Sequence, residues 1–475
     1  MTWFKHSFAS QLPSSMYSFQ EPIPVRLPEM VLYNDQLANE LGMENAWSPE
    51  KALSILSGNM VLEGSKSISQ AYAGHQFGHF TRLGDGRAVL LGEIDTPNGL
   101  NDLQLKGSGR TPYSRRGDGR ATLYSMLREY LISESMHSLG IPTTRSLAVV
   151  KTGEEVYREV THEGGILSRV AKSHIRVGTF EFAGFLGSET DLSALLDYTV
   201  ERHYPELLHE PNMALTLLEK VMLKQKDLVI DWLRVGFIHG VMNTDNVSIA
   251  GETIDYGPCA FMNTYKARTV FSSIDRAGRY AFVNQPDLAY WNMKVFAHAL
   301  LPMIDPVEEE ALKKAEVVLA RFPKMFSKSY LNMMTNKLGI ENHVEADFEL
   351  VKECLEILEK YEIDYTNFFT HLKSDGQLVQ NLKSQLDFQE WYEKWEVARI
   401  RMSDLDRSGA LMEKTNPVVI PRNHLVEEVL EKAIQGDMKP FHDLFKSLSN
   451  PYDRDAKSQS TPTEFDEGYQ TFCGT

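Results

Sequence analysis

The residues with the clearest chemical potential lie in two short stretches near the middle of the chain. The first, His239-Gly240-Val241-Met242-Asn243-Thr244-Asp245-Asn246, ends on an acid and an amide, and the second, Asp255-Tyr256-Gly257, begins nine residues later. Amide and carboxylate oxygens are ligands that Mg2+ takes from proteins when phosphates and water complete its shell. Asn246 and Asp255 therefore indicate a metal site that serves a nucleotide.

The same spacing occurs in the catalytic loop of kinases. There, His-x-Asp-x4-Asn supplies a base at its third position and a metal-binding Asn at its eighth, and a later Asp-Phe-Gly aspartate also holds metal. Asn246 fills the eighth position and Asp255 the later one, but Val241 occupies the place of the base. A valine cannot accept a proton. Kinase chemistry is therefore disfavoured, unless Asp245 acts as a base from another angle.

A glycine turn and two strands are predicted upstream. Leu83-Gly84-Asp85-Gly86-Arg87 precedes the apolar run 88–91. Glycines at such a turn allow backbone N–H groups to approach a phosphate before the chain enters a strand. Polar and apolar residues alternate over 102–106, which predicts a second strand that ends on Lys106. We therefore expect Lys106 to pair with phosphate oxygens.

The partner that orients Lys106 is expected on the following helix. Segment 122–134 has apolar residues at helical spacing, and Glu129 lies among them. A glutamate at this place in a kinase orients the strand lysine. Glu129 is the expected partner, and Glu134 is the alternative.

Residues 107–120 contain an unusual density of glycine and arginine for a chain with a formal net charge of -16. This acidity, and the lack of a nucleic-acid-binding motif, disfavour a nucleic-acid partner. A local phosphate cradle fits better, because glycines let backbone donors approach and guanidinium groups bind phosphate oxygens. Arg169 and Arg176 would add two cations, although surface exposure is the default expectation for each arginine taken alone.

The elements around these motifs follow the order of a kinase C-lobe. The pattern predicts a helix over 214–237 and a short hairpin over 247–255. The chain after residue 302 is predicted to be mostly helical, and Trp391 and Trp395, four residues apart, are expected to pack in its core.

Together these motifs resemble the selenoprotein O family, in particular its bacterial YdiU type, whose members are protein adenylyltransferases with a pseudokinase fold. The matching runs follow the family's order over most of the chain: 71–78, 84–87, 105–109, 116–120, 239–246, 255–258, 416–417 and 420–424. The resemblance implies transfer of AMP from ATP to Ser, Thr or Tyr hydroxyls of proteins, with release of diphosphate. Two alternatives stay open: a protein or small-molecule kinase that uses Asp245 as its base, and an ATP-binding pseudokinase scaffold.

The resemblance also implies roles for single residues. ATP would bind in an orientation flipped relative to kinases, with the α-phosphate at the reacting position. Asp245 would accept the proton; the comparison with kinases makes Lys106 and Glu129 the other expected catalytic residues. Asn246 and Asp255 would bind Mg2+, with Mn2+ as the alternative metal. The nucleotide contacts would come from Gly84, Gly86, Arg87, Lys106, Asp118, Gly119, Arg169, Arg176 and Asp255.

The predicted fold class is α+β, a protein-kinase-like two-lobed fold with an added, mostly helical C-terminal region, which suits a chain of 475 residues. The expected parts are an N-terminal extension over 1–80, a nucleotide-binding N-lobe over 81–180, a C-lobe with the catalytic loop and metal site over 181–300, and helices and a tail over 301–475. No apolar run approaches the ~20 residues that span a bilayer. We expect a cytoplasmic monomer that binds ATP and protein substrates, and neither nucleic acid nor membrane.

Histidines and cysteines carry further expectations. His75 and His79 are four residues apart, but interleaved glycines disfavour a metal-binding helix, so a structural or adenine-proximal loop is expected.

Cys354 lies on the apolar stripe of a predicted helix and is expected to be an inert core residue. The resemblance implies a redox-active residue near the C-terminus, where Cys473 lies. We hypothesise a reversible disulfide between Cys473 and Cys259; the alternative is that Cys259 is simply buried.

Overall fold

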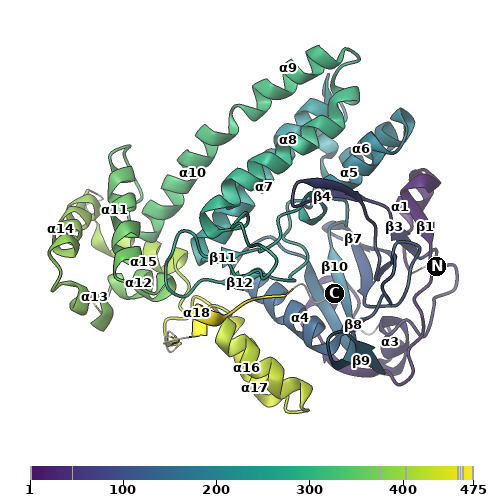
Figure 1. Cartoon of the computed structure of the whole chain (residues 1–475), viewed down its shortest axis with the longest axis horizontal. Helices are drawn as coiled ribbons and strands as arrows, with labels where there is room; N and C mark the ends of the chain where they lie inside the picture. The colour runs from purple at the N-terminus through teal and green to yellow at the C-terminus, as the bar shows by residue number, and fades with distance from the viewer. Residues whose placement is uncertain are drawn as a thin grey trace.

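A large antiparallel sheet forms one side of the molecule, in a computed structural model that describes residues 3–44, 46–374, 376–401, 404–456, 459–460, 462 and 465–472 (Figure 1). The fold is mixed α/β, with many helices beside the sheet. The strand order is β1-β3-β6-β7-β10-β9-β2, and β8 pairs with β10. The strands are β1 (Tyr17–Phe19), β2 (Glu29–Tyr33), β3 (Ile68–Gln70), β6 (Ala88–Thr96), β7 (Gly99–Lys106), β8 (Ala121–Thr122), β9 (Arg145–Tyr157) and β10 (Thr161–Ala171).

Strands β6 and β7 confirm the two strands predicted from the apolar run and the alternating run. Lys106 ends β7 and is paired with Ala88 of β6 on one side and Leu167 of β10 on the other. Because β7 has neighbours on both edges, its last five residues are buried, and the lysine is held by a rigid central strand.

Helix α4 (Leu123–Ser138) packs against β9 and β10 and confirms the helix predicted over 122–134. Thr122 caps its start, since the Thr122 side chain accepts a hydrogen bond from the Ser125 amide. The other helices before residue 305 are α1 (Ser7–Gln11), α2 (Asp35–Glu40), α3 (Pro49–Leu56), α5 (Val177–Phe185), α6 (Glu189–His203), α7 (Met213–Val235) and α8 (Gln285–Ile304). Helix α7 confirms the helix predicted over 214–237.

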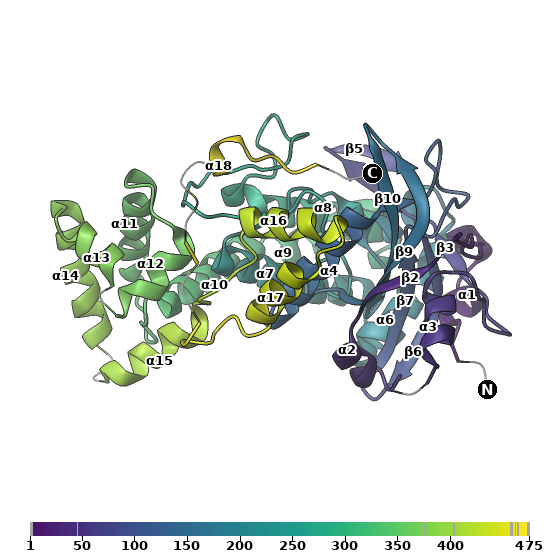
Figure 2. The same cartoon turned by 90° about the horizontal axis from the view of Figure 1, so that it is seen from below.

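The region after residue 302 is helical, as predicted, and most of it lies at the end of the molecule opposite the sheet (Figures 1 and 2). Helices α16 and α17 instead return to pack against α4. The helices are α9 (Glu308–Leu319), α10 (Phe322–Lys337), α11 (Asp347–Lys360), α12 (Tyr365–Leu372), α13 (Gln377–Leu382), α14 (Leu386–Ile400), α15 (Leu405–Thr415), α16 (Asn423–Ile434), α17 (Lys439–Leu448) and α18 (Phe465–Gly468). Trp391 and Trp395 are fully buried and stacked, with centroids 6.1 Å apart, which confirms core packing.

The predicted hairpin over 247–255 is wrong. Ser248 forms a bridge with Arg176, and Thr253 forms one with Thr143, so each arm pairs with a distant segment instead of with the other arm. Two two-stranded sheets lie apart from the large one: the hairpin of β4 (Ala73–Gln76) and β5 (His79–Arg82), and the pair of β11 (Phe237–Ile238) with β12 (Ala260–Phe261), which a long loop separates. Among the described residues, no helix is long and apolar enough to cross a membrane.

Candidate active site

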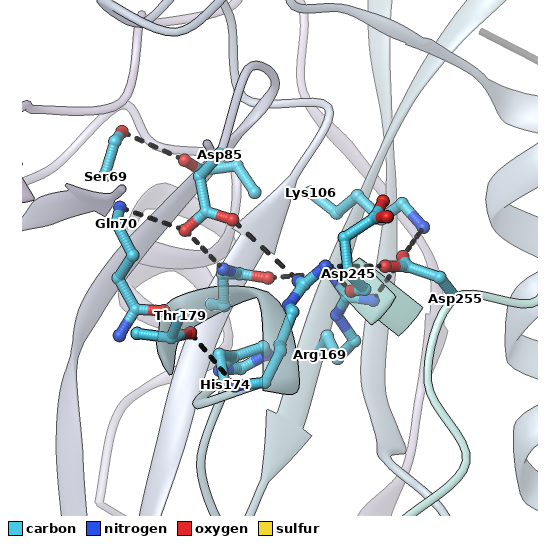
Figure 3. Close-up of polar contacts among 12 residues, drawn as sticks. Ser69, Gln70, Asp85, Lys106, Arg169, His174, Thr179, Asp245 and Asp255 are labelled. Carbon is cyan, nitrogen blue, oxygen red and sulfur yellow. Dashed lines mark hydrogen bonds and ion pairs between the residues drawn. The ribbon is translucent and has the colours of Figure 1, made fainter. Parts of the chain in front are cut away.

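Lys106 lies at the centre of a buried ion-pair cluster. Its Nζ is 2.6 Å from Glu129 Oε2 and 2.7 Å from Asp255 Oδ1, and Figure 3 shows the contact with Asp255. Strand β7 supplies the lysine, α4 supplies the glutamate, and the loop before β12 supplies the aspartate. The alternative partner, Glu134, instead binds Arg145 at 2.8 Å. The structure thus brings together the lysine and the glutamate that the sequence paired.

Two arginines complete this cluster. Arg169 Nη1 lies 2.7 Å from Asp255 Oδ1, and Arg176 Nη1 lies 3.2 Å from Asp255 Oδ2. Each arginine is only 2% exposed, so the default expectation of surface exposure is wrong for both. Their counter-charges, Asp255, Glu129 and Asp85, come from segments that are distant in the sequence from the arginines. Buried charge is tolerated here because each guanidinium is paired.

Asp255 is strained and strongly acidic. Its φ is 64°, in the left-handed region that a non-glycine residue adopts at a cost of about 1 kcal/mol. Burial alone would raise the pKa of Asp255, but Arg169, Lys106 and Arg176 outweigh burial and hold this pKa well below its usual range. The carboxylate is therefore ionised at neutral pH and concentrates negative charge opposite three cations.

The loop 239–246 is tied to the Asp255 segment. His239 is buried, which lowers the pKa of its imidazole, and its Nε2 is 3.0 Å from the carbonyl oxygen of Ile254. Gly240 has a φ of 81°, and a Cβ there would lie 2.3 Å from the Pro258 carbonyl oxygen, so only glycine fits. Val241, at the place of a kinase base, is 7% exposed and cannot take part in proton transfer.

Asp245 is a buried carboxylate whose surroundings raise its pKa. It lies in a 3-10 turn over Thr244–Asn246, is 9% exposed, and its Oδ1 has no hydrogen-bond partner among the described residues. Burial raises the pKa of Asp245 to about 6; Arg176 opposes this shift, and Asp255 and Glu181 add to it. Such a group is mostly ionised at neutral pH but more basic than an exposed aspartate, as a general base must be.

Asn246 and Asp255 fit a magnesium site that is completed by a nucleotide. Asn246 Nδ2 donates to the Val241 carbonyl oxygen at 3.1 Å, so its Oδ1 is the atom that would bind a metal. Arg176 Nη1 donates to the Asp245 carbonyl oxygen at 2.9 Å and also contacts Asp255, so it joins the two segments. No cluster of three His, Cys, Asp or Glu side chains in the described part of the chain could hold a metal alone. Phosphates and water would supply the remaining ligands.

The glycine turn and the loop 107–120 lie against each other. A Cβ at Gly84 would lie 2.4 Å from the Tyr113 ring, and the Ser114 hydroxyl donates to the Gly86 carbonyl oxygen. Gly119 has a φ of 71°, and a Cβ there would lie 2.1 Å from the Gly109 carbonyl oxygen. The two segments predicted to bind phosphate, the turn 83–87 and the loop 107–120, therefore pack against each other at the start of β6.

Two other predicted nucleotide contacts lie at the edge of this layer. The Arg87 carbonyl oxygen accepts a hydrogen bond from the Gly107 amide at 2.7 Å, so the backbone at Arg87 joins the turn to the loop. Asp118 is exposed and pairs with Arg158 at 2.8 Å. The structure therefore does not bring Asp118 into the buried cluster around Lys106.

Comparisons with known proteins identify the family of this chain. A family model described as "Protein adenylyltransferase SelO" matches residues 4–449. The chain belongs to this family. Proteins named "Protein nucleotidyltransferase YdiU" are similar over nearly the full length. That of Halalkalibacterium halodurans is 51% identical over 100% of this chain and 98% of its own, that of Brevibacillus brevis 52% over 99% and 97%, and that of Pelagibacter ubique 50% over 100% and 99%.

Two polar residues of this SelO-family site, Asp85 and Gln104, were missed by sequence reasoning. Asp85 is 2% exposed, and burial raises its pKa to about 6. Its carboxylate accepts hydrogen bonds from the Gln70 amide and from Gln104 Nε2, both at 3.1 Å. Gln104 Oε1 in turn accepts from Arg169 Nη2 at 2.8 Å. Asp85 lies between the two glycines, and Gln104 precedes Lys106 by two residues on the same strand face, so both could have been found by position.

Of the two cysteines in the proposed disulfide, the structure describes Cys259 but not Cys473. Cys473 lies outside the described residues, so its disulfide stays a prediction. Cys259 is fully buried, its Sγ lies 3.6 Å from Arg128 Nη1, and burial raises the pKa of its thiol, which suits the alternative of a buried small residue. Thr471 Oγ1 donates to the Pro258 carbonyl oxygen at 2.7 Å, so the described tail reaches the neighbourhood of Cys259. Cys354 is buried, as predicted.

Proposed function

We propose that this SelO-family chain transfers AMP from ATP to Ser, Thr or Tyr hydroxyls of proteins and releases diphosphate, with Mg2+ as its metal. The observation that carries the proposal is that the loop 239–246 lacks an acid at the position of the kinase base but has one four residues later. Val241 fills the kinase base position, whereas Asp245 presents a buried carboxylate oxygen without a partner. A base displaced from the kinase position suits a reaction at a phosphate other than the γ-phosphate.

The chain's own residues supply the rest of the chemistry. The acceptor hydroxyl oxygen attacks the α-phosphorus, its proton passes to Asp245, and the bond from the α-phosphorus to the diphosphate oxygen breaks. Lys106, Arg169 and Arg176 lie in one buried cluster, where they would offset the charge that develops on the departing diphosphate. Glu129 holds Lys106 in place. Mg2+ on Asn246 and Asp255, when bound, would neutralise phosphate charge.

We also propose a kinase-like division of the chain. Residues 81–180 hold the glycine turn, Lys106, Glu129 and Arg169 and would act as the nucleotide-binding lobe. Residues 181–300 hold the loop 239–246 and Asp255 and would act as the second lobe. The contacts of Asp255 with Lys106 and Arg169 then join the two lobes across the nucleotide site. Residues 1–80 and 301–475 would flank this unit.

Radiolabelled ATP tests the reaction. Full-length protein is incubated with Mg2+, protein acceptors, and ATP labelled at either the α- or the γ-phosphate. Label from the α-position alone is expected in protein, and Asp245→Asn should reduce it to background while ATP still binds. Label from the γ-position would establish a kinase and overturn the proposal. ATP binding without either label would leave the scaffold alternative.

A further inference from the structure

The β4–β5 hairpin carries an unusual residue at its tip. Phe77 has a φ of 52° and Gly78 a φ of 86°, so a phenylalanine adopts the left-handed conformation that glycine or asparagine normally takes in such a turn. The Phe77 amide donates to Asn243 Oδ1 at 3.2 Å, and this contact with the loop 239–246 holds the strained tip. Phe77 is 37% exposed, and one part of its ring packs against the buried Tyr280, with centroids 5.3 Å apart.

A group of aromatic rings follows this tip in the sequence and on the neighbouring helices. Phe80, on β5, is 40% exposed and contacts Phe185 of α5, which is 38% exposed, with centroids 5.7 Å apart. His75 lies behind Phe80 and joins it to Trp291 of α8, with centroids 5.5 Å apart on each side. We call Phe77, Phe80, Phe185 and Trp291 the aromatic ridge. Phe77, Phe80 and Phe185 are exposed and Trp291 is half-buried, and exposed apolar patches often mark sites that bind other proteins.

The aromatic ridge adjoins the proposed acceptor side of the active site. The His75 amide donates to Thr244 Oγ1 at 2.8 Å, beside Asp245. A Cβ at Gly74 would lie only 2.3 Å from Asp245 Oδ1, so the hairpin backbone lies directly against the proposed base. Strand β4 also contacts α5 and the 3-10 turn that carries Asp245.

Two arginines lie beside the aromatic ridge; the acidic neighbours are Glu181, which is buried and contacts His75, and Asp275, which accepts from the Arg279 amide. Arg82 ends β5 and lies over the Phe182 ring at 5.7 Å, and Arg279 lies over the Trp291 ring at 4.9 Å. Within the described residues, neither arginine forms an ion pair with a carboxylate, although the chain as a whole has a net charge of -16. Arginine and aromatic side chains are the types enriched where proteins bind other proteins.

We propose that the aromatic ridge, with Arg82 and Arg279, binds an extended segment of the acceptor protein that carries aromatic and acidic residues next to the modified hydroxyl. This inference rests on the proposed transfer of AMP to proteins. The ridge leads to Asp245, so a segment bound along it delivers its hydroxyl to the base. The unpaired arginines select acidic residues, and the exposed rings bind an aromatic one.

Synthetic peptides test the preference. Each peptide carries one Ser, Thr or Tyr, flanked by Glu and Phe, by Lys and Phe, or by Glu and Ala, and transfer from α-labelled ATP is followed. We expect the lowest KM for the Glu and Phe set. Equal KM values for the three sets would overturn the inference while leaving the proposed function intact. Absence of α-label from every peptide, with protein acceptors still labelled, would also overturn the inference; absence of α-label from peptides and protein acceptors alike would overturn the proposed function itself.

Variants test the surface. Phe80→Ala and Phe77→Gly, which relaxes the strained turn, should each raise the KM for the Glu and Phe peptides about tenfold and leave the KM for ATP unchanged. Arg82→Glu should reverse the preference toward Lys and Phe peptides. Phe348→Ala, an exposed phenylalanine on α11, is the matched control and should change neither KM. Unchanged peptide KM values in Phe80→Ala and Arg82→Glu would overturn the inference.

Discussion

At the scale of single residues, the active-site cluster depends on the balance between two carboxylates and three cations. Glu129 and Asp255 face Lys106, Arg169 and Arg176 in a region where each charge is paired. The resemblance to kinases predicted the Lys106 and Glu129 pair. It did not predict that Asp255 would contact all three cations, because those contacts join segments far apart in the chain.

The Lys106 and Glu129 pair should behave as one unit. Glu129→Gln removes the charge that holds Lys106, and Lys106→Ala removes the cation itself, so each variant should lose most of kcat/KM. The double variant should lose little more than Lys106→Ala alone, because the second change removes an interaction that is already absent. Steady-state kinetics of the four proteins measures this coupling. Losses that add would show that the two residues act separately.

Asp255→Asn should affect both activity and stability. Loss of the carboxylate removes a metal ligand, so transfer should fall to background. It also leaves Lys106, Arg169 and Arg176 with a reduced counter-charge, which should lower the free energy of unfolding by about 3 kcal/mol. Urea unfolding measures the loss, and ATP without metal should restore part of it, since phosphates replace the missing charge. Wild-type transfer by this variant at ordinary Mg2+ would remove Asp255 from the metal site.

Glu252 gives a prediction for pH. Burial raises the pKa of Glu252 to about 7 from 4.5, although Lys172 and its amide lower it. Between pH 4.5 and pH 7, Glu252 is ionised in the unfolded chain but still protonated in the folded protein, so rising pH favours unfolding. Above pH 7, Glu252 therefore lowers the free energy of unfolding by roughly 3 kcal/mol. Glu252→Gln should therefore be more stable than wild type at pH 8 and equal to it near pH 4. Urea unfolding at both pH values checks this, and a constant difference would refute it.

At the scale of elements, the local pattern of apolar residues predicted the helices and strands that this pattern determines. Helices α4 and α7 and strands β6 and β7 were found because their apolar residues repeat with the period of the element. The hairpin over 247–255 was predicted wrongly, because its arms pair with Arg176 and Thr143, which no nearby residue reveals. The buried state of Arg169 and Arg176 was missed for the same reason.

The loop 107–120 is an element whose shape depends on one glycine. Gly119→Ala would place a Cβ against the Gly109 carbonyl oxygen and would also require a left-handed alanine. We expect the KM for ATP to rise about tenfold, because the loop must shift away from the turn 83–87. Gly117→Ala, in the same loop, would meet its nearest atom at 3.2 Å and serves as the control. Equal ATP affinity in both variants would argue against a nucleotide-binding loop.

At the scale of the whole molecule, the run 420–424 connects the C-terminal helices to the active-site body. Arg422 is fully buried and lies 2.7 Å from Asp364 at the start of α12. The Asn423 side chain bonds both to the Phe261 amide, at 3.0 Å, and to the Phe261 carbonyl oxygen, at 2.8 Å. The segment after Asp255 is therefore fixed from the far end of the chain.

Arg422→Ala should destabilise the protein by about 3–5 kcal/mol, because it removes the guanidinium that pairs with the buried Asp364 carboxylate. The paired change Arg422→Met with Asp364→Asn removes both charges and keeps an acceptor for the α12 cap, so it should recover much of the loss. Thermal and urea unfolding compare the variants. If the paired change were as unstable as Arg422→Ala, the charge argument would fail.

The described tail has a consequence for when activity can arise. Thr471 exchanges hydrogen bonds with the backbone of Phe271 and Ser273 and donates to the Pro258 carbonyl oxygen. Residues 258–273, which follow Asp255, therefore gain these partners only after residue 471 has left the ribosome. A nascent chain that already contains Lys106, Asp245 and Asp255 still lacks this support. These hydrogen bonds therefore cannot form while residue 471 is still inside the ribosome, although the active-site residues have already been synthesised.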